Sequence, residues 1–235
     1  MLKALLLAVC ATAAVAAADR VDSSTGISFP QQARFSVSDE ALELCGVGAR
    51  VKAYIIKIYS VGFYAAAPAV VSASGGEFSS LCSASPCAAV LTFKMGIGAQ
   101  KVAEALAGVA GVDPAVLSTF QALLVDGMGG YVYAGESLTL EWAGSKTTVG
   151  VRGNVVGSID DQVLTAGLID MYTGAKLGNK AVSPALRKDM ALHVAEIAPG
   201  LAAAPASEAP EAEAEPEVAA EEPEAAAEAA AETEL

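Results

Sequence analysis

Apolar residues along this chain follow two periods, and each period predicts one kind of element. Alternation with many β-branched and aromatic residues predicts strands, at residues 44–66, 88–95, 137–142 and 146–151, with two short pieces on either side of Pro30 within 27–37. Recurrence at helical spacing predicts helices, at residues 100–109, from 114 onward, 158–173 and 185–198. Residues 67–86, rich in Ala, Ser, Gly and Pro, are predicted to form a loop with room for one short helical turn.

Capping residues mark where the predicted helices begin and end. Asp113 followed by Pro114 is an N-cap with proline at the first helical position, and Ser158 with Asp161 has the spacing of a capping box. Gly174 ends the helix that this box begins. Since strands come first, then two helices, a hairpin and two more helices, we predict an α+β fold with helices layered on one face of an antiparallel sheet.

Arg50 places a guanidinium inside an otherwise apolar strand segment, and a buried arginine needs a partner or an anionic ligand. If residues 44–66 fold as a hairpin about Tyr54-Ile55, Arg50 pairs with Tyr59 and the two side chains share a face. On one continuous strand their odd separation would send them to opposite faces, and no Asn-Gly or Asp-Gly is present to favour a two-residue turn. The alternative role for Arg50 is a structural ion pair at a strand end.

The two ends of the chain differ from its middle. Residues 1–18 have one charge, Lys3, then a short apolar run and three final alanines, which is typical of a secretory signal peptide rather than a membrane span. Residues 201–235 are mostly Ala, Pro and Glu, with eleven Glu and no Lys or Arg, so they cannot bury enough apolar surface to fold. We therefore predict one domain over 19–200, a disordered acidic tail, and no transmembrane segment after signal removal.

The net charge of the chain limits the kinds of partner it can have, and the leader limits the compartments to which it can be sent. The formal charge is −13, but without the tail glutamates and Lys3 the remaining 13 Lys and Arg stand against 16 Asp and Glu, a balance of −3. A nearly neutral domain without a basic stripe argues against nucleic acid as a partner. The leader predicts a secreted or organelle-targeted protein, with a plastid as destination if it is the first half of a bipartite address.

The segment after the leader holds three cysteines and one histidine. Cys82 and Cys87 would close a small disulfide loop in an oxidising compartment, whereas Cys45 is expected to pack as a small hydrophobe. No metal site is predicted, because His193 is the only histidine and no second CxxC motif accompanies it. A histidine-activated nucleophile is excluded unless His193 serves alone. Trp142, at the end of a hairpin strand, is expected to anchor the core.

Four segments, taken in their order along the chain, resemble those of a known family. They are Gly46-x-Gly48-x-Arg50-x-Lys52, Lys57 to Tyr64, Lys101 to Glu104, and Asp170 to Gly174 leading to Val182-Ser183-Pro184. In this order they resemble the chalcone isomerase superfamily, and more closely its non-catalytic, fatty-acid-binding-like branch, over residues 35–197. The resemblance implies an open-faced β-sandwich, in which an apolar cleft separates an antiparallel sheet from a layer of helices. It implies no cofactor.

Several positions depart from the pattern of true chalcone isomerases. The resemblance implies that Arg50 would steady a substrate phenolate and that Lys101 remains in place. The family's polar positions fall here on changed residues: the catalytic tyrosine on Gly98, an asparagine on Ala105, a strand threonine on Tyr59 and a late-helix hydroxyl residue on Met171. Each hydrogen bond missing from such a site costs on the order of tenfold to a thousandfold in rate, which weighs against flavanone chemistry.

In the fatty-acid-binding branch, an arginine and a tyrosine clamp a carboxylate while the cleft takes the acyl chain, and Arg50 and Tyr59 match those roles. Lys101 completes the predicted ligand site as a rim cation or solvated residue, because lysines rarely stay buried. We therefore expect a binding protein rather than an enzyme, with a fatty acid or similar carboxylate amphiphile as its small-molecule ligand.

Two other functions remain open. An isomerase acting on a phenolic enone, with Arg50 and Lys101 as its catalytic cations, would be favoured by Tyr54 or Tyr172 in the space left at Gly98. A structural or partner-binding protein would be favoured by a cleft filled with side chains, those of Met95, Met171 and Phe120.

Overall fold

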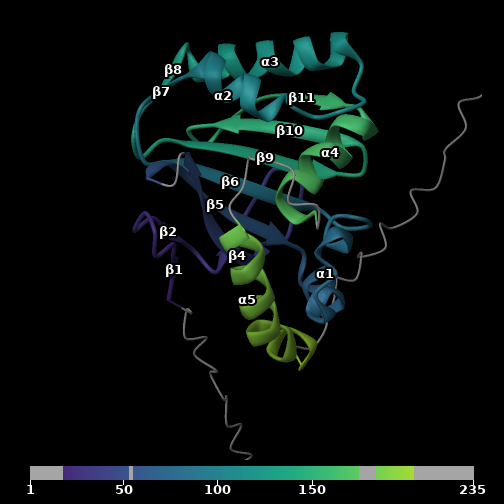
Figure 1. Cartoon of the computed structure of the whole chain (residues 1–235). Coiled ribbons are helices and arrows are strands. Elements are labelled where there is room, and N and C mark those ends of the chain that lie inside the picture. Colours follow the sequence, from purple (N-terminus) through teal and green to yellow (C-terminus); the bar gives the residue numbers. More distant parts are fainter. Residues whose placement is uncertain (1–17, 53–54, 175–183, 204–235) are drawn as a thin grey trace, which may run out of the picture. The chain divides into compact units, whose positions relative to one another are not determined.

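The computed structural model describes residues 18–52, 55–174 and 184–203. Within them, one antiparallel sheet has seven strands (Figure 1), in the order β11 (Asn154–Asp160), β10 (Lys146–Val151), β9 (Ser137–Ala143), β6 (Cys87–Phe93), β5 (Ile56–Ala65), β4 (Leu42–Lys52) and β3 (Gln32–Ala33). Two short strand pairs accompany the sheet, β1 (Arg20–Val21) with β2 (Ser28–Phe29) and β7 (Ile97–Gly98) with β8 (Tyr131–Val132). The predicted leader and almost all of the predicted acidic tail lie outside the described residues.

The helices share one hydrophobic core with one face of the sheet, which confirms the predicted α+β architecture. They are α1 (Ala67–Ser72), α2 (Ala99–Leu106), α3 (Pro114–Met128), α4 (Gln162–Thr173) and α5 (Pro184–Ala203). The sheet contributes Val61, Phe63 and Leu91 to this core, each fully buried. A smaller cluster on the other face gathers around Phe29 and Tyr64. The N-terminal segment therefore covers the face that the helices leave open.

Of the two alternatives for residues 44–66, the hairpin is the one that forms, with Arg50 directly opposite Tyr59. A register shift between Arg50 and Val51 makes Lys52 the partner of Ile56, so the predicted two-residue turn at Tyr54-Ile55 is wrong. The alternative of one continuous strand through residues 44–66 is wrong, because the chain turns back between Lys52 and Ile56. The predicted β9–β10 hairpin is confirmed as well, and so is the N-cap at Asp113, whose carboxylate accepts the amide of Ala115.

Three local predictions are wrong. The segment predicted as a loop holds α1 and two short 3₁₀ turns, Ala73–Gly75 and Phe78–Ser80, because Val70, Phe78 and Leu81 are buried in the core. Ser158 does not cap a helix but lies in β11, an edge strand with no fully buried residue and therefore no clear apolar alternation in its sequence. Asp161 alone caps α4. The last helix continues through Pro199 to Ala203, where Leu201 packs against the core.

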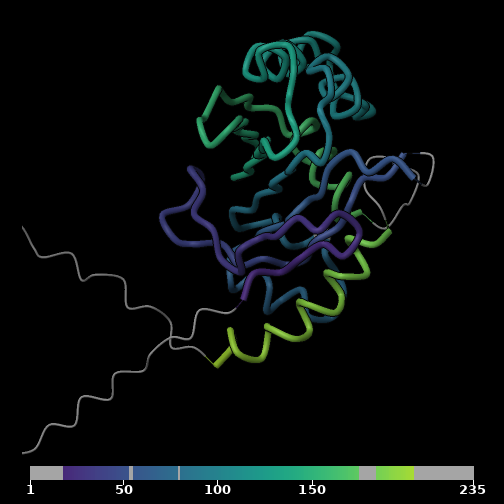
Figure 2. Tube along the Cα trace, turned by 90° about the vertical axis from the view of Figure 1, so that its left-hand side faces the viewer, coloured from purple at the N-terminus to yellow at the C-terminus, as the bar shows by residue number. Residues whose placement is uncertain are grey.

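Two glycines of β4 let α5 approach the sheet closely. A Cβ at Gly48 would lie 2.6 Å from the Cα of Leu186, and one at Gly46 would lie 2.8 Å from the backbone nitrogen of Met190. Figure 2 shows α5, in yellow-green, running beside the purple N-terminal strands. Because Arg50 is the next β4 residue on this face after Gly48, the same close packing sets one wall of its surroundings.

We expect Gly48→Ala to lower the free energy of unfolding by about 2 kcal/mol, because the added methyl overlaps α5 backbone that a side-chain rotation cannot relieve. Gly75→Ala is the matched control, since a Cβ there meets nothing within 4 Å. Urea unfolding followed by circular dichroism measures both. Equal midpoints for the two variants would contradict the packing of α5 on β4.

Candidate functional site

Arg50 and Tyr59 lie side by side on adjacent strands, on the face that the helices cover. Tyr59 is 4% exposed and meets Phe93 edge to face, with ring centroids 5.7 Å apart. Arg50 is half-buried near the end of β4. The hairpin therefore holds a guanidinium and a phenol together in a largely apolar setting.

Tyr172 of α4 brings a second phenol to this place. Its ring is 1% exposed and packs against Phe63 and Trp142, with centroids 6.4 Å and 6.1 Å away. Its hydroxyl has no hydrogen-bond partner among the described residues. A buried hydroxyl without a partner costs about 1–3 kcal/mol, so this position is suited to a polar group that arrives with a ligand.

Electrostatics link the three side chains, which we call the Arg50 cluster (Arg50, Tyr59 and Tyr172). Burial raises the pKa of Tyr59 to about 12, although the charge and hydrogen bond of Arg50 oppose that rise. Burial also raises the pKa of Tyr172 well above its ordinary value, with Tyr59 reinforcing the rise and Arg50 opposing it. Both phenols stay protonated at neutral pH, so the cluster offers hydrogen-bond donors beside a fixed positive charge.

The other residues predicted for the ligand site lie outside the buried surroundings of the Arg50 cluster. Lys101 is exposed on α2 and does not share the buried environment of the cluster. Gly98 directly precedes α2, and a Cβ there would meet nothing within 4 Å. Of the side chains expected in a filled cleft, Phe120 and Met171 are buried in the core, while Met95 is 42% exposed. Tyr54 lies outside the described residues.

The sequence predicts a helix that contains Tyr172, and it gives this tyrosine a role only if the protein is an isomerase. One feature of the sequence could have indicated a role for Tyr172: it lies next to Met171 in the segment from Asp170 to Gly174, the fourth of those that resemble the chalcone isomerase superfamily. Helical spacing gives the face on which Tyr172 lies, but not the strand residues opposite that face. Only the packing of α4 on the sheet shows that Tyr172 belongs with Arg50 and Tyr59.

The cysteines have structural surroundings. Cys82 and Cys87 form a disulfide that closes the loop before β6. Cys45 is a free thiol, fully buried, which confirms its predicted packing; burial raises the pKa of its thiol, so it stays protonated and unreactive. Trp142 is 1% exposed in the core, also as predicted.

A separate pocket of about 420 Å³ opens beside the disulfide. It lies between Cys82, the β9–β10 turn at Gly144, and one side of α4 that includes Thr165 and Ile169. The residues of the Arg50 cluster do not line it. Thr165 is already engaged there, because its hydroxyl bonds Thr147 and the Ser145 carbonyl.

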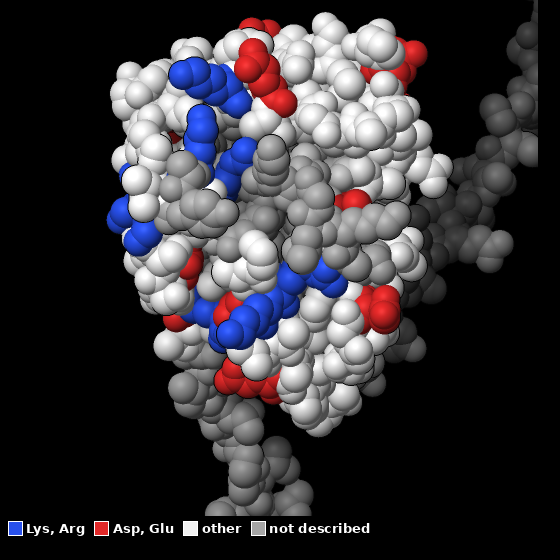
Figure 3. Space-filling view, in the orientation of Figure 1, with Lys and Arg blue, Asp and Glu red and all other residues white. Residues whose placement is uncertain are grey.

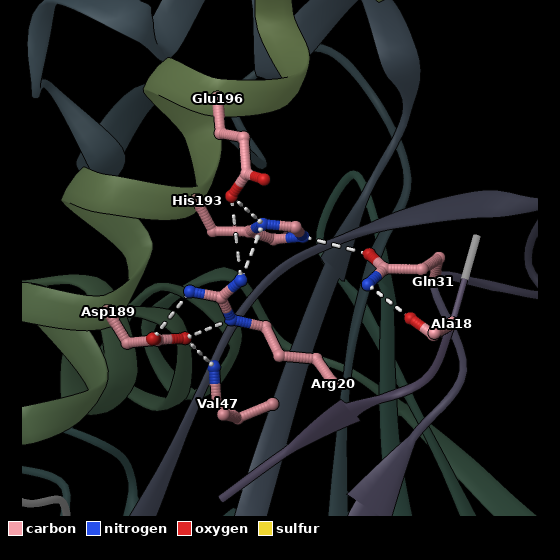
Figure 4. A network of polar contacts seen from close by, with 7 residues as sticks. All are labelled: Ala18, Arg20, Gln31, Val47, Asp189, His193 and Glu196. Atoms are coloured by element: carbon pink, nitrogen blue, oxygen red, sulfur yellow. Dashed lines mark hydrogen bonds and ion pairs between the residues drawn. The ribbon is translucent and has the colours of Figure 1, made fainter.

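His193 belongs to a polar network that fastens the N-terminal segment to α5 (Figure 4). The guanidinium of Arg20 donates two hydrogen bonds to Asp189, of 2.9 and 2.8 Å. Asp189 also accepts the backbone amide of Val47 at 2.8 Å, along the edge of β4 beyond the two residues that pair with β3. This network holds α5 along the exposed edge of β4.

The geometry assigns the tautomer of His193. Its Nδ1 lies 2.9 Å from Nη1 of Arg20, which can only donate, so Nδ1 accepts. Nε2 therefore carries the proton and donates to the side-chain oxygen of Gln31 at 2.9 Å. The 3.4 Å approach of Nδ1 to Glu196 is secondary, because Glu196 is 70% exposed. Both ring nitrogens are engaged structurally, so His193 is not poised as a lone nucleophile.

Comparison with known proteins supplies a fold. No protein-family profile matches the sequence, and no curated protein matches it. Among solved structures, the chain is similar to a fatty-acid binding protein from Arabidopsis thaliana, with 23% sequence identity and a TM-score of 0.59 over 77% of this chain and 98% of that one. The chain thus has the chalcone isomerase-like fold, which confirms the predicted fold class.

Two properties concern the described residues alone. None of their helices combines the length and apolar character needed to cross a bilayer. Within the same residues, no group of three or more His, Cys, Asp or Glu side chains could hold a metal ion.

We expect the protein to lose stability as pH falls below about 6.5, the ordinary pKa of histidine. Burial, and next the charge of Arg20, lower the pKa of His193 in the folded chain. The unfolded chain therefore takes up a proton that the folded one resists, and stability declines until the lower folded pKa is reached. Thermal melts between about pH 7 and pH 5 measure this.

His193→Gln is the comparison for that melt series, since glutamine can bond without titrating. The variant should show a shallower decline over the same pH interval. A decline equal to that of the unchanged chain would show that His193 is not the titrating group.

Proposed function

We propose that the chain binds a fatty acid or a similar carboxylate amphiphile, with the head group at the Arg50 cluster. The observation that carries the proposal is the hydroxyl of Tyr172, buried and without a partner beside the charge of Arg50. A carboxylate accepts several hydrogen bonds and carries the charge that a guanidinium attracts. Such a head group would satisfy Tyr172 and gain a charge-assisted bond from Arg50.

Protonation supports the choice of an anionic head group. Both hydroxyls keep their protons at the pH where a carboxylic acid is ionised, since the ordinary pKa of tyrosine is already about 10 and burial raises the pKa values of Tyr59 and Tyr172 further. The ligand would then supply acceptors where the protein supplies donors. An acyl chain following the head group among apolar side chains would contribute about 0.8 kcal/mol for each buried methylene.

The comparison supports the same class of ligand. The similar solved structure is titled a fatty-acid binding protein, and its chain is covered almost completely by this one. At 23% identity that likeness supplies the fold alone, so the ligand is argued from the side chains of this chain.

An isomerase of the chalcone isomerase type is the second candidate. The observation that favours it is the phenol of Tyr172 near Arg50, because a tyrosine hydroxyl beside an arginine could serve an enone substrate. Against it stand the changes at Gly98, Ala105 and Met171. Met171 is 4% exposed and offers no hydroxyl.

We expect Arg50→Ala to weaken binding of a long-chain fatty acid about a hundredfold, and Tyr172→Phe about tenfold, because charged hydrogen bonds are the stronger ones. Isothermal titration with palmitate measures both, on the chain from Ala18 onward. Native mass spectrometry of the same preparations detects any fatty acid carried through purification.

Matched controls separate the site from general effects. Arg34→Ala and Tyr133→Phe remove the same groups from exposed positions and should bind as the unchanged chain does. Tyr172→Phe should keep or raise the thermal midpoint, since it removes a buried hydroxyl that has no partner among the described residues. A chain that binds no fatty acid but cyclises a chalcone, with activity lost in Arg50→Ala, would replace the binding proposal with the isomerase.

A further inference from the structure

Large apolar side chains are exposed together at one end of the sheet, where the β4–β5 hairpin turns and β6 ends. Ile55 is 80% exposed and Tyr133 61% exposed, values far from those of a packed core. The full set, which we call the apolar end, is Val51, Ile55, Ile56, Met95, Tyr131 and Tyr133.

Backbone pairing brings these residues to one end although they come from three parts of the chain. Lys52 pairs with Ile56 beside the hairpin turn. The next strand ends alongside, because the amide of Lys94 donates to the carbonyl of Ile58, and Met95 follows. A Cβ at Gly96 would meet the ring and hydroxyl of Tyr131, so β8 lies directly against this turn. Tyr131 and Tyr133 then contact each other, with ring centroids 5.0 Å apart.

Three lysines border the apolar end: Lys52, Lys57 and Lys94, all exposed. Lys57 donates to the backbone carbonyl of Ser24, and none of the three forms an ion pair with a described residue. Figure 3 shows several Lys and Arg side chains at the upper left and left of the molecule, and a second group of them in its lower centre. This end is thus locally cationic in a chain whose formal charge is −13.

We propose that the apolar end, with its lysine border, docks on the surface of an anionic lipid bilayer. Isoleucine and methionine side chains would enter the interfacial region, tyrosine rings would lie at the head-group level, and the lysines would meet lipid phosphates. Each lysine close to an anionic surface strengthens binding about fivefold at low salt.

Charge favours a lipid surface over a second copy of this chain. Two copies joined through the apolar end would bring their lysines toward each other without acidic partners, whereas anionic lipids supply the missing negative charge. The docking rests on this surface alone and does not need the proposed fatty acid. It would nevertheless place Arg50 and Tyr59, close behind the hairpin turn, near the membrane that holds such ligands.

The test is co-sedimentation of the chain from Ala18 onward with vesicles of phosphatidylcholine, with and without phosphatidylserine. We expect binding to the vesicles that contain phosphatidylserine, weakening as salt rises. Ile55→Glu and Lys94→Glu should each weaken it about tenfold. Leu192→Glu and Lys146→Glu alter an exposed leucine and an exposed lysine elsewhere, and should keep it.

Several results would overturn the proposal. The first is that the unchanged chain does not bind the vesicles, and the second is that the control variants lose binding equally. The third is a dimer, seen in sedimentation velocity, that Ile55→Glu abolishes, which would make the apolar end an interface between copies. Palmitate titration without vesicles keeps this question apart from the ligand site. Ile55→Glu should bind palmitate normally, so failure of docking and failure of fatty-acid binding are distinguishable.

Discussion

The antiparallel register of β4 and β5 is the constraint on which the candidate site depends. It sets Arg50 opposite Tyr59 and, on the same face, brings Gly48 and Gly46 beneath α5. A slip of one residue would turn the guanidinium to the other face and put side chains where the helix needs bare backbone. The register therefore fixes both the Arg50–Tyr59 pair and the position of the helix beside it.

The uncovered edge of β4 explains why the N-terminal segment belongs to the domain. Beyond Leu42–Glu43, which pair with β3, an amide such as that of Val47 has no strand beside it among the described residues, and Asp189 accepts its hydrogen bond. Asp189 is held in turn by Arg20, and Arg20 by His193. Residues almost 170 positions apart are thus joined, and the edge is closed to pairing with another chain.

The chemistry of the Arg50 cluster is the basis of the proposed binding of a carboxylate. Arg50 and the two phenols interact in a setting that disfavours deprotonation of either phenol, as the raised pKa values of Tyr59 and Tyr172 express. A site that binds a carboxylate needs donors fixed in place, whereas a site that moves protons needs a group that changes state near neutral pH. The cluster meets the first requirement with its own residues, which is why binding is preferred to catalysis.

The local sequence pattern was enough to predict many of the secondary-structure elements of this protein. Alternation and capping residues predicted the β9–β10 hairpin and the start of α3. Pairing arithmetic showed that Arg50 and Tyr59 would meet if residues 44–66 formed a hairpin, because cross-strand neighbours share a face. The leader and acidic tail stay predictions from composition. Tertiary structure alone decided that β11 is a strand, that Tyr172 joins the cluster and that α5 passes Pro199. Each of these depends on contacts with residues distant in sequence, which outweigh local propensity.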